Sequence, residues 1–233
     1  PVWTFNTNGT VVRLIVRPEL GKIWAGCVDN HVYMIDIETG ALLGDINVQR
    51  RIYDIDVTRD GSKVLISAGV NTAKHNLMLY TAEGEQLYNQ QFRTQIKGCA
   101  FTADETGIAL VNSRGELQRL DLEGNVLAAA KVSYEQIAME PIQTAQGAAH
   151  LSLGTDGCTV FDDEMNVLVS QRPNIVAGDV PTAVGASGDG SLIFVGTKER
   201  YLYAMDLSGR QIFSARLGNT PSCMAPLGDT VYI

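Results

Sequence analysis

The chain has 233 residues, of which 45% are hydrophobic and 19% are charged, and its formal net charge is −8. This length suffices for one large domain or two small ones, with a core that needs no disulfide or metal. The composition excludes disorder and collagen, the apolar runs are too short for a membrane helix, and the acidic balance argues against general nucleic-acid binding.

The predicted elements are short strands separated by turns. Residues 1–8 are predicted to form a strand, and the alternating apolar and polar residues of 31–36 predict a second, half-buried one. The clearest group of four strands follows at 52–58, 63–68, 76–81 and 85–92. At the end of the chain, residues 221–233 supply one strand and part of another. No stretch keeps a helical apolar stripe over three turns, so we expect an all-β fold.

One turn motif recurs five times, and its anchor position is occupied by Gly40, Gly84, Gly124, Met165 and Gly209. The spacings between successive anchors are 44, 40, 41 and 44 residues. A period of about 42 residues with strand-like content is typical of the four-stranded blade of a β-propeller. An aspartate that can bond the turn backbone precedes four of the anchors, namely Asp36, Asp121, Asp162 and Asp206.

We therefore predict a single β-propeller domain over residues 1–233, with five complete four-stranded antiparallel blades and a sixth split between the ends of the chain. In the split blade, residues 1–8 would supply the fourth strand and residues 221–233 the first strand and part of the second. The missing third strand would expose a sheet edge, which natural proteins avoid. We expect the chain to be a portion of a longer protein, with six blades if the ring closes and seven or eight in a longer parent.

The strings Asp36-Ile-Glu-Thr-Gly40-Ala-Leu-Leu and Pro1-Val-Trp3-Thr-Phe resemble the repeats of the pyrroloquinoline-quinone-like β-propeller family. The resemblance implies that Trp3, four places after an anchor, is a docking residue. In the other repeats the matching positions are occupied by Gly44, Tyr88, Ala128, Val169 and Phe213. Dehydrogenases of this family hold their quinone beside adjacent cysteines and a calcium-binding carboxylate. The chain has no adjacent cysteines, so the resemblance favours the non-catalytic branch, which includes an outer-membrane assembly lipoprotein.

The residues that could carry chemistry form no convergent set. Cys27, Cys99, Cys158 and Cys223 lack the spacing of a zinc site, and we expect small buried hydrophobes, although four cysteines would permit two disulfides. His31, His75 and His150 are expected to be exposed turn residues. The string Asp54–Asp60 imitates the start of a calcium loop, but position 65 is a leucine where such a loop has glutamate. We predict no catalytic residue, no cofactor and no metal.

The charged residues are distributed unevenly between the two rims of the predicted propeller. The turns between first and second strands and between third and fourth strands share one rim, which is strongly acidic. The other turns share the opposite rim, which carries a small excess of basic residues. We predict that this less acidic rim meets an anionic protein surface or ligand, because complementary potentials speed encounter. The candidate partner-binding residues are Arg50, Arg51, Arg93 and Arg200.

The sequence thus predicts a non-catalytic propeller scaffold that mediates protein–protein interaction through its rim loops, which packed blades hold rigidly. Two alternatives stay open: a quinoprotein-like enzyme and a sensor that binds a small molecule. No nucleic-acid partner and no transmembrane segment are expected, and the oligomeric state is undetermined. The isolated cysteines weakly favour the cytoplasm. A periplasmic or extracellular location is open if a signal lies upstream of Pro1.

Overall fold

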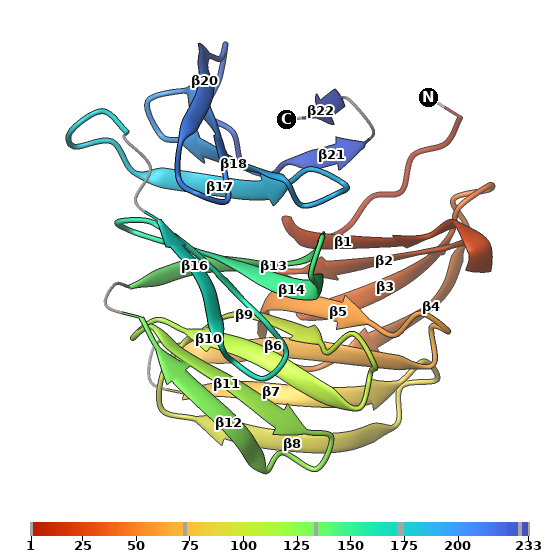
Figure 1. Cartoon of the computed structure of the whole chain (residues 1–233). Helices are drawn as coiled ribbons and strands as arrows, with labels where there is room; N and C mark the ends of the chain where they lie inside the picture. Colours follow the sequence, from red (N-terminus) through yellow and green to blue (C-terminus); the bar gives the residue numbers. More distant parts are fainter. Residues whose placement is uncertain (1, 72–73, 133–134, 172–174, 228–229, 233) are drawn as a thin grey trace. The chain divides into compact units, whose positions relative to one another are not determined.

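The computed structural model describes residues 2–71, 74–132, 135–171, 175–227 and 230–232. Apart from the short 3-10 helix η1 (Pro18–Leu20), the regular elements in these ranges are strands (Figure 1). The strands up to β20 form five four-stranded antiparallel sheets, in each of which strands that follow one another in the chain pair together. Consecutive blades of this kind define a β-propeller, so the predicted fold class is confirmed.

The five sheets follow one another along the sequence. The first contains β1 (Val11–Arg17), β2 (Lys22–Cys27), β3 (His31–Asp36) and β4 (Leu42–Asn47). The second contains β5 (Arg51–Val57), β6 (Lys63–Asn71), β7 (Lys74–Thr81) and β8 (Gln86–Phe92). The third contains β9 (Ile96–Phe101), β10 (Gly107–Asn112), β11 (Glu116–Asp121) and β12 (Val126–Lys131). The last two contain β13 (Gln136–Thr144), β14 (Gly147–Gly154), β15 (Cys158–Phe161), β16 (Val167–Gln171), β17 (Pro181–Ala186), β18 (Leu192–Thr197), β19 (Tyr201–Asp206) and β20 (Gln211–Arg216).

The chain divides into two compact units, and each is described by itself. The first unit comprises Pro1–Ile108 and Leu120–Asn125, and the second comprises Ala109–Arg119 and Val126–Ile233. The first two sheets and β9 therefore belong to the first unit, and the last two sheets belong to the second. That the whole chain is one domain stays a prediction.

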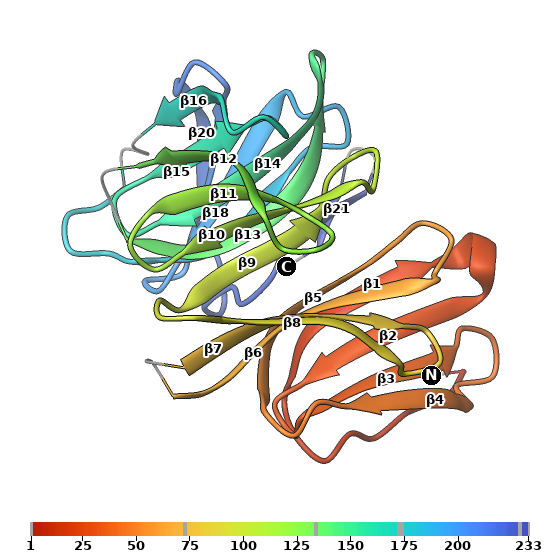
Figure 2. The same cartoon turned by 90° about the horizontal axis from the view of Figure 1, so that it is seen from below.

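In the first unit, an apolar core fills the space between the first two sheets, which lie side by side in both views (Figures 1 and 2). Trp24, Ile55 and Ile66 are fully buried in it. Burying a side chain of this size contributes roughly 1.5–3 kcal/mol. Ile46 and Val48 extend the same core to the end of β4. This packing fixes the position of the loop that leaves β4.

Two buried aspartates on β5 link this strand to β9. Asp54 accepts a hydrogen bond of 3.0 Å from the main-chain N–H of Cys99, and Asp56 accepts one of 2.8 Å from that of Phe101. Burial raises the pKa of Asp56, while the hydrogen bonds from Phe101 and Val57 oppose the rise. The acidic string in which these residues lie therefore has a structural role.

The recurring anchors are turns with a left-handed backbone. The φ angles at Gly40, Gly84, Gly124 and Gly209 lie between 71° and 92°, and Met165 adopts 65° at the equivalent position. The preceding aspartates close these turns, as when Asp36 Oδ1 accepts the main-chain N–H of Thr39 at 2.8 Å. The hydrogen bond from the Thr39 hydroxyl contributes most to lowering the pKa of Asp36. A side-chain bond from the aspartate to the turn backbone and a positive φ angle at the anchor are both needed to form this turn, which explains why the two positions recur together.

Two aromatic side chains lie against the anchor turn of the next sheet. The ring of Trp3 covers Gly40 so closely that a Cβ on this glycine would lie 2.6 Å from the indole, and its Nε1 donates to the carbonyl oxygen of Ile37 at 3.0 Å. Tyr88 on β8 covers Gly124 in the same way. Trp3 therefore packs on the Gly40 turn, and its role as a docking residue of the family stays a prediction.

In the second unit, apolar side chains fill the space between the fourth and fifth sheets. Leu151, Ile193 and Val195 are fully buried there. β17 contacts β13 and β14, and the short strand β21 (Ala225–Leu227) contacts β17 in turn. β21 pairs with β22 (Thr230–Tyr232) in a sheet that contains only these two strands among the described residues.

The predicted sixth blade is not confirmed. Residues 2–8 form no strand, contrary to the expectation that residues 1–8 supply the outer strand of a blade. They run in an irregular conformation, in which Trp3 is held by Ile37 and the main-chain N–H of Asn8 donates to Asp29 at 3.1 Å. The first strand and part of the second that were expected in residues 221–233 correspond to β21 and β22.

Candidate functional site

Three of the four arginines predicted to bind a partner lie at one end of the sheets of the first unit. Arg50 and Arg51 lie where β4 passes into β5, and Arg93 follows β8. Because the strands alternate in direction, the loop between β6 and β7 belongs to this same end, and Lys74 begins β7 there. We call the end that carries Arg50, Arg51, Lys74 and Arg93 the basic rim.

Arg200 lies in the second unit. It occupies the turn between β18 and β19, is exposed, and has a φ angle of 69°. The structure therefore brings Arg50, Arg51 and Arg93 to one rim of the first unit, and Arg200 belongs to the second unit. The acidic character predicted for the opposite rim stays a prediction.

A groove with a volume of about 640 Å³ opens beside Arg50 in the first unit. Its deep side is formed by Val48, Met78 and Tyr80, which are at most 8% exposed. Its polar lining consists of the side chains of Asn47, Gln49, Gln86, Asn89 and Gln91, with the cations Arg50 and Lys74. The volume lies within the range of roughly 300–1,000 Å³ that is usual for ligand sites. We call this the β4–β8 groove.

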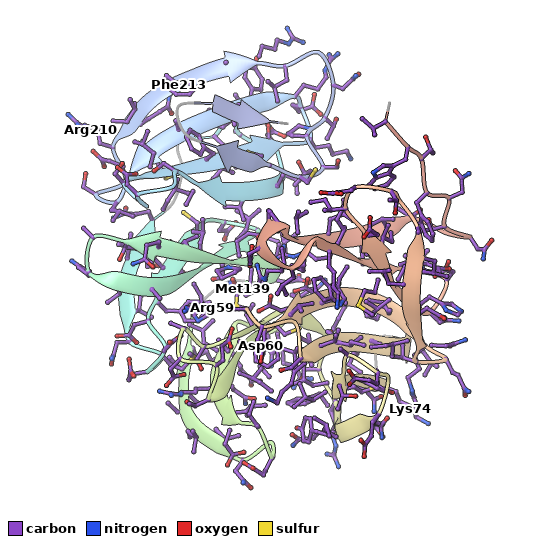
Figure 3. All side chains as sticks on the ribbon, turned by 90° about the vertical axis from the view of Figure 1, so that its right-hand side faces the viewer. Arg59, Asp60, Lys74, Met139, Arg210 and Phe213 are labelled. Atoms are coloured by element: carbon purple, nitrogen blue, oxygen red, sulfur yellow. The ribbon has the colours of Figure 1, made fainter. Side chains whose placement is uncertain are left out.

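The alternation of strand residues explains why β7 contributes to this groove. Lys74, Met78 and Tyr80 are separated by even numbers of residues and so face the same side of the second sheet. Met78 and Tyr80 on that side pack into the core shared with Ile46 and Val48. Figure 3 shows the side chain of Lys74 at the edge of its sheet, pointing away from the ribbon. One face of β7 thus carries apolar groups inside and a cation at its end.

A register shift brings the amides of β8 into the same groove. Asn89 pairs opposite Met78, whereas the shift between Leu79 and Tyr80 places Gln86 opposite Tyr80. Gln86 therefore faces the same side as Asn89 despite the odd separation between them. The hydroxyl of Tyr80 donates to Gln86 Oε1 at 2.9 Å, and Asn89 Nδ2 lies 3.4 Å from the same oxygen. The side chain of Gln91 makes no such bond with a described residue.

The turn after β4 holds Arg50 beside the groove. The main-chain N–H of Val48 donates to the carbonyl oxygen of Asn30 at 3.0 Å, and Val48 itself is buried. Asn47 Oδ1 accepts the main-chain N–H of Gln49 at 2.8 Å, and Gln49 has a φ angle of 55°. An asparagine side chain that bonds the backbone two residues later stabilises a tight turn. The loop is therefore fixed at both of these residues before it reaches Arg50.

Among the residues that the structure describes, the cations of the basic rim have no acidic partner. Arg50, Lys74 and Arg93 make no hydrogen bond or ion pair through their side chains with any described residue. The nearby carboxylates are engaged elsewhere, because Asp45 lies 2.6 Å from the ring of His31 and Asp29 accepts the hydroxyl of Tyr33 at 2.7 Å. Unpaired cations on a fixed surface create a positive potential that attracts anions.

Local electrostatics are consistent with this arrangement. Burial raises the pKa of Tyr80, and the positive charge of Arg50 opposes the rise. The guanidinium group therefore acts on the polar wall of the groove. Arg51 is held differently: its guanidinium lies 6.0 Å from the centre of the Tyr53 ring, a cation–π geometry. Of the two adjacent arginines, Arg50 lines the groove.

The sequence prediction missed part of this site. Lys74 lies on the same rim as Arg50 but is not among the predicted binding residues. The amides Gln86, Asn89 and Gln91 are not among them either. The unusual signal was the polar stretch of β8, in which five of seven residues between Gln86 and Phe92 are polar or tyrosine. Its meaning depended on the register shift, which strand alternation alone does not predict.

The prediction of exposed turn histidines is wrong for all three residues. His75 lies within β7 and is fully buried beside Tyr53, at 5.2 Å between ring centres. His150 lies within β14, is 2% exposed, and has its Nε2 2.8 Å from Asp163 Oδ1. His31 begins β3 and is partly buried. Each histidine therefore lies in a strand and not in a turn.

The cysteines follow the expectation except at one position. Cys27, Cys99 and Cys158 are buried and free, whereas Cys223 is free and exposed. Within the described ranges, no three His, Cys, Asp or Glu side chains are placed to hold a metal ion. The same ranges contain no helix that is long and apolar enough to cross a membrane.

Comparisons with known proteins add no family assignment: the chain significantly matches neither a protein-family model nor a curated protein sequence.

Proposed function

We propose that the chain is a non-catalytic β-propeller scaffold whose basic rim binds an acidic surface of another protein. The observation that carries this proposal is the set of unpaired cations Arg50, Lys74 and Arg93 at one end of the first unit. Cations that are not neutralised within their own chain attract an acidic partner and orient its approach. The loop that bears Arg50 is fixed by the buried Val48 and by the bond from Gln49 to Asn47, which lowers the entropy lost on binding.

We further propose membership of the pyrroloquinoline-quinone-like propeller family, in its non-catalytic branch. The support is the contact of Trp3 with the Gly40 turn and the similar contact of Tyr88 with Gly124. A sixth blade, shared between the ends of the chain, belongs to the same proposal. Its support is the hairpin of β21 and β22, because β21 contacts β17 just as β17 contacts β13.

A sensor that binds a small molecule is the second candidate function. The volume of the β4–β8 groove, about 640 Å³, favours it over the quinoprotein alternative. Thermal stabilisation of the protein by a member of a metabolite panel would support the sensor, because a ligand of the native state raises stability by mass action.

Polyglutamate is a suitable probe of the scaffold proposal because it presents carboxylates without any specific fold. Its affinity for the full chain can be measured by isothermal titration calorimetry over a range of NaCl concentrations. We expect the substitutions Arg50→Glu and Arg93→Glu each to weaken binding by about tenfold at low salt. Lys131→Glu is the matched control, since it makes the same charge change at an exposed residue of β12 in the second unit.

The control variant is expected to bind polyglutamate almost as well as the unmodified protein. Affinity for the unmodified protein is also expected to fall as salt rises, because screening weakens attraction between exposed charges. Equal weakening by all three variants would indicate a non-specific effect of net charge and would contradict a binding role for the basic rim. Affinity that did not change with salt would contradict it as well.

A further inference from the structure

We infer that the β4–β8 groove binds an extended peptide segment in which acidic and apolar residues alternate. This inference rests on the proposed function and names the part of the acidic partner that the first unit recognises. The groove combines an apolar floor, a wall of amides and two cations, and each of these features selects a different part of such a segment.

The apolar floor provides a place for hydrophobic side chains. Met78 is 1% exposed and Val48 is 6% exposed, so only a small part of each side chain contacts the groove. Val70 of β6, which also lines the groove, is 58% exposed. An apolar group placed against Val70 would remove this surface from water, at roughly 25 cal/mol for each Å² buried. A purely ionic ligand, such as a phosphate group, would leave the surface exposed.

The amides suit the main chain of a peptide. A glutamine or asparagine side chain both donates and accepts hydrogen bonds, as does each peptide unit. Gln91 has no side-chain partner among the described residues, and Gln91 and Asn89 are two residues apart on the same side of β8. Asn89 Oδ1 accepts Asn76 Nδ2 at 2.6 Å, so Gln91 is the amide best placed to bond the main chain of an extended peptide that runs along this strand.

The cations select carboxylates. Arg50 presents a planar group that can bind a carboxylate through two parallel hydrogen bonds, and Lys74 presents a point charge. Both line the groove, and neither is neutralised by a described carboxylate. In an extended segment successive side chains point to opposite sides. Apolar residues can therefore face Val48 and Val70 while the acidic residues between them lie at the mouth of the groove, within reach of the partly buried Arg50 and the exposed Lys74.

Binding of a defined peptide tests this inference. The probe is a fluorescein-labelled octapeptide of alternating glutamate and valine with blocked ends, titrated with the full chain and followed by fluorescence anisotropy. Control peptides contain glutamine in place of glutamate, or serine in place of valine. We expect both control peptides to bind at least about tenfold more weakly, since each lacks one of the two kinds of contact. Inorganic phosphate and a short single-stranded RNA serve as competitors and are not expected to displace the probe.

The decisive variant is Gln91→Trp, which fills the groove without changing its charge. Gln91 is exposed and its side chain makes no bond with a described residue, so this change should leave the fold intact. The matched control is Gln211→Trp, the same change at an exposed residue of β20. We expect Gln91→Trp to weaken binding of the Glu–Val peptide at least about tenfold, and Gln211→Trp to leave it unchanged. Circular dichroism confirms that both variants are folded.

The outcomes separate this inference from the proposed function. If Arg50→Glu weakens binding but Gln91→Trp does not, the basic rim binds acidic chains without using the groove, and the inference is wrong while the proposed function stands. If neither change has an effect, both are wrong. Equal affinity for the glutamate and glutamine peptides, or displacement of the probe by phosphate or RNA, would also overturn the inference.

Discussion

Replacing Gly40 with alanine tests whether docking of Trp3 on an anchor turn stabilises the first unit. Gly40 has a φ angle of 71°, and a Cβ at this position would lie 2.6–2.8 Å from three carbon atoms of the Trp3 ring. Real Cβ atoms do not approach other atoms so closely, so the indole would have to move. Its movement would also break the 3.0 Å hydrogen bond from Nε1 to the carbonyl oxygen of Ile37.

The structure allows the cost to be worked out from three contributions. A left-handed backbone costs a non-glycine residue about 1–2 kcal/mol. Forcing a methyl group into a packed contact costs about 1–3 kcal/mol. Alanine restricts the unfolded chain more than glycine does, and this effect raises the free energy of unfolding by about 0.4–1 kcal/mol. Together these values predict that Gly40→Ala lowers the free energy of unfolding by about 1–5 kcal/mol, with a central value of about 3 kcal/mol.

Gly178→Ala is the matched control for this change. Gly178 has a φ angle of 86°, but its Cβ would have no neighbour within 4 Å. The control therefore carries the backbone cost without the contact with an aromatic ring, and we expect a loss of about 1 kcal/mol or less. Urea unfolding followed by circular dichroism measures both values. Fluorescence adds a local signal, because Trp3 and Trp24 are the two tryptophans of the chain and Trp24 is fully buried.

In the Gly40→Ala variant, displacement of Trp3 should shift tryptophan emission to longer wavelength, and Gly178→Ala should cause no shift. A double variant with Trp3→Ala completes the test, because removal of the indole should abolish the part of the cost that comes from the clash. Equal losses of stability in the two single variants would refute the reasoning. So would a clash cost that persists after Trp3 has been removed, since the two substitutions would then be independent.

Two further predictions concern titration and thiol reactivity. Hydrogen bonds from the main-chain N–H of Ser62 and from nearby hydroxyls lower the pKa of Asp60 to about 2. The stabilising effect of the Asp60 carboxylate should therefore be fully present above about pH 4 and be lost as the pH falls toward 2. The difference in Tm between the unmodified protein and Asp60→Ala should shrink over that range. A difference in Tm that does not change with pH would contradict this prediction. In the native protein, only the exposed thiol of Cys223 should react rapidly with Ellman's reagent, and the buried thiols should react only after unfolding. Burial raises the pKa of Cys158 to about 11 and that of Cys99 well above its usual value, which disfavours their reactive thiolate forms. Rapid reaction of more than one thiol would contradict the burial of Cys27, Cys99 and Cys158.

The sequence was most informative where structure depends on local turn chemistry. Aspartate and glycine at the anchors act within a few residues, so their recurrence predicted five blades, and three of the four strands predicted for the second sheet lie within two residues of their observed bounds. The strand predicted at 52–58, for example, is β5 at Arg51–Val57. Met165 shows that even an anchor without glycine keeps the left-handed turn, at a φ angle of 65°. Local bonds of Asp162 to Asn166 hold that turn in place of glycine's conformational freedom.

The site was harder to predict because it depends on which side of a sheet each residue faces. The positions of Arg50 and Arg93 followed from connectivity, which the repeat provided. Gln86 could not be assigned to the groove, because a single register shift reverses the side that it faces. The burial of His75 was missed for a related reason: a residue expected in a turn lies within β7, on a side of the strand that faces the protein interior.

Variation at the docking position explains why a groove can exist between the first two sheets. Trp3 and Tyr88 each bring a large ring onto the next anchor turn, whereas the equivalent position on β4 is Gly44, which has no side chain to contribute. The nearest neighbour of a Cβ at Gly84 is Ile46, at 4.0 Å, so this turn is less closely covered than the turn at Gly40. On this side of the first two sheets, Ile46 of β4 and the following Val48 share a core cluster with Met78 and Tyr80 of β7. A repeat that keeps the aspartate and glycine of its anchor turn, but has no aromatic ring packed on that turn, still forms a blade and leaves space beside it. In this chain the cations Arg50 and Lys74 line that space.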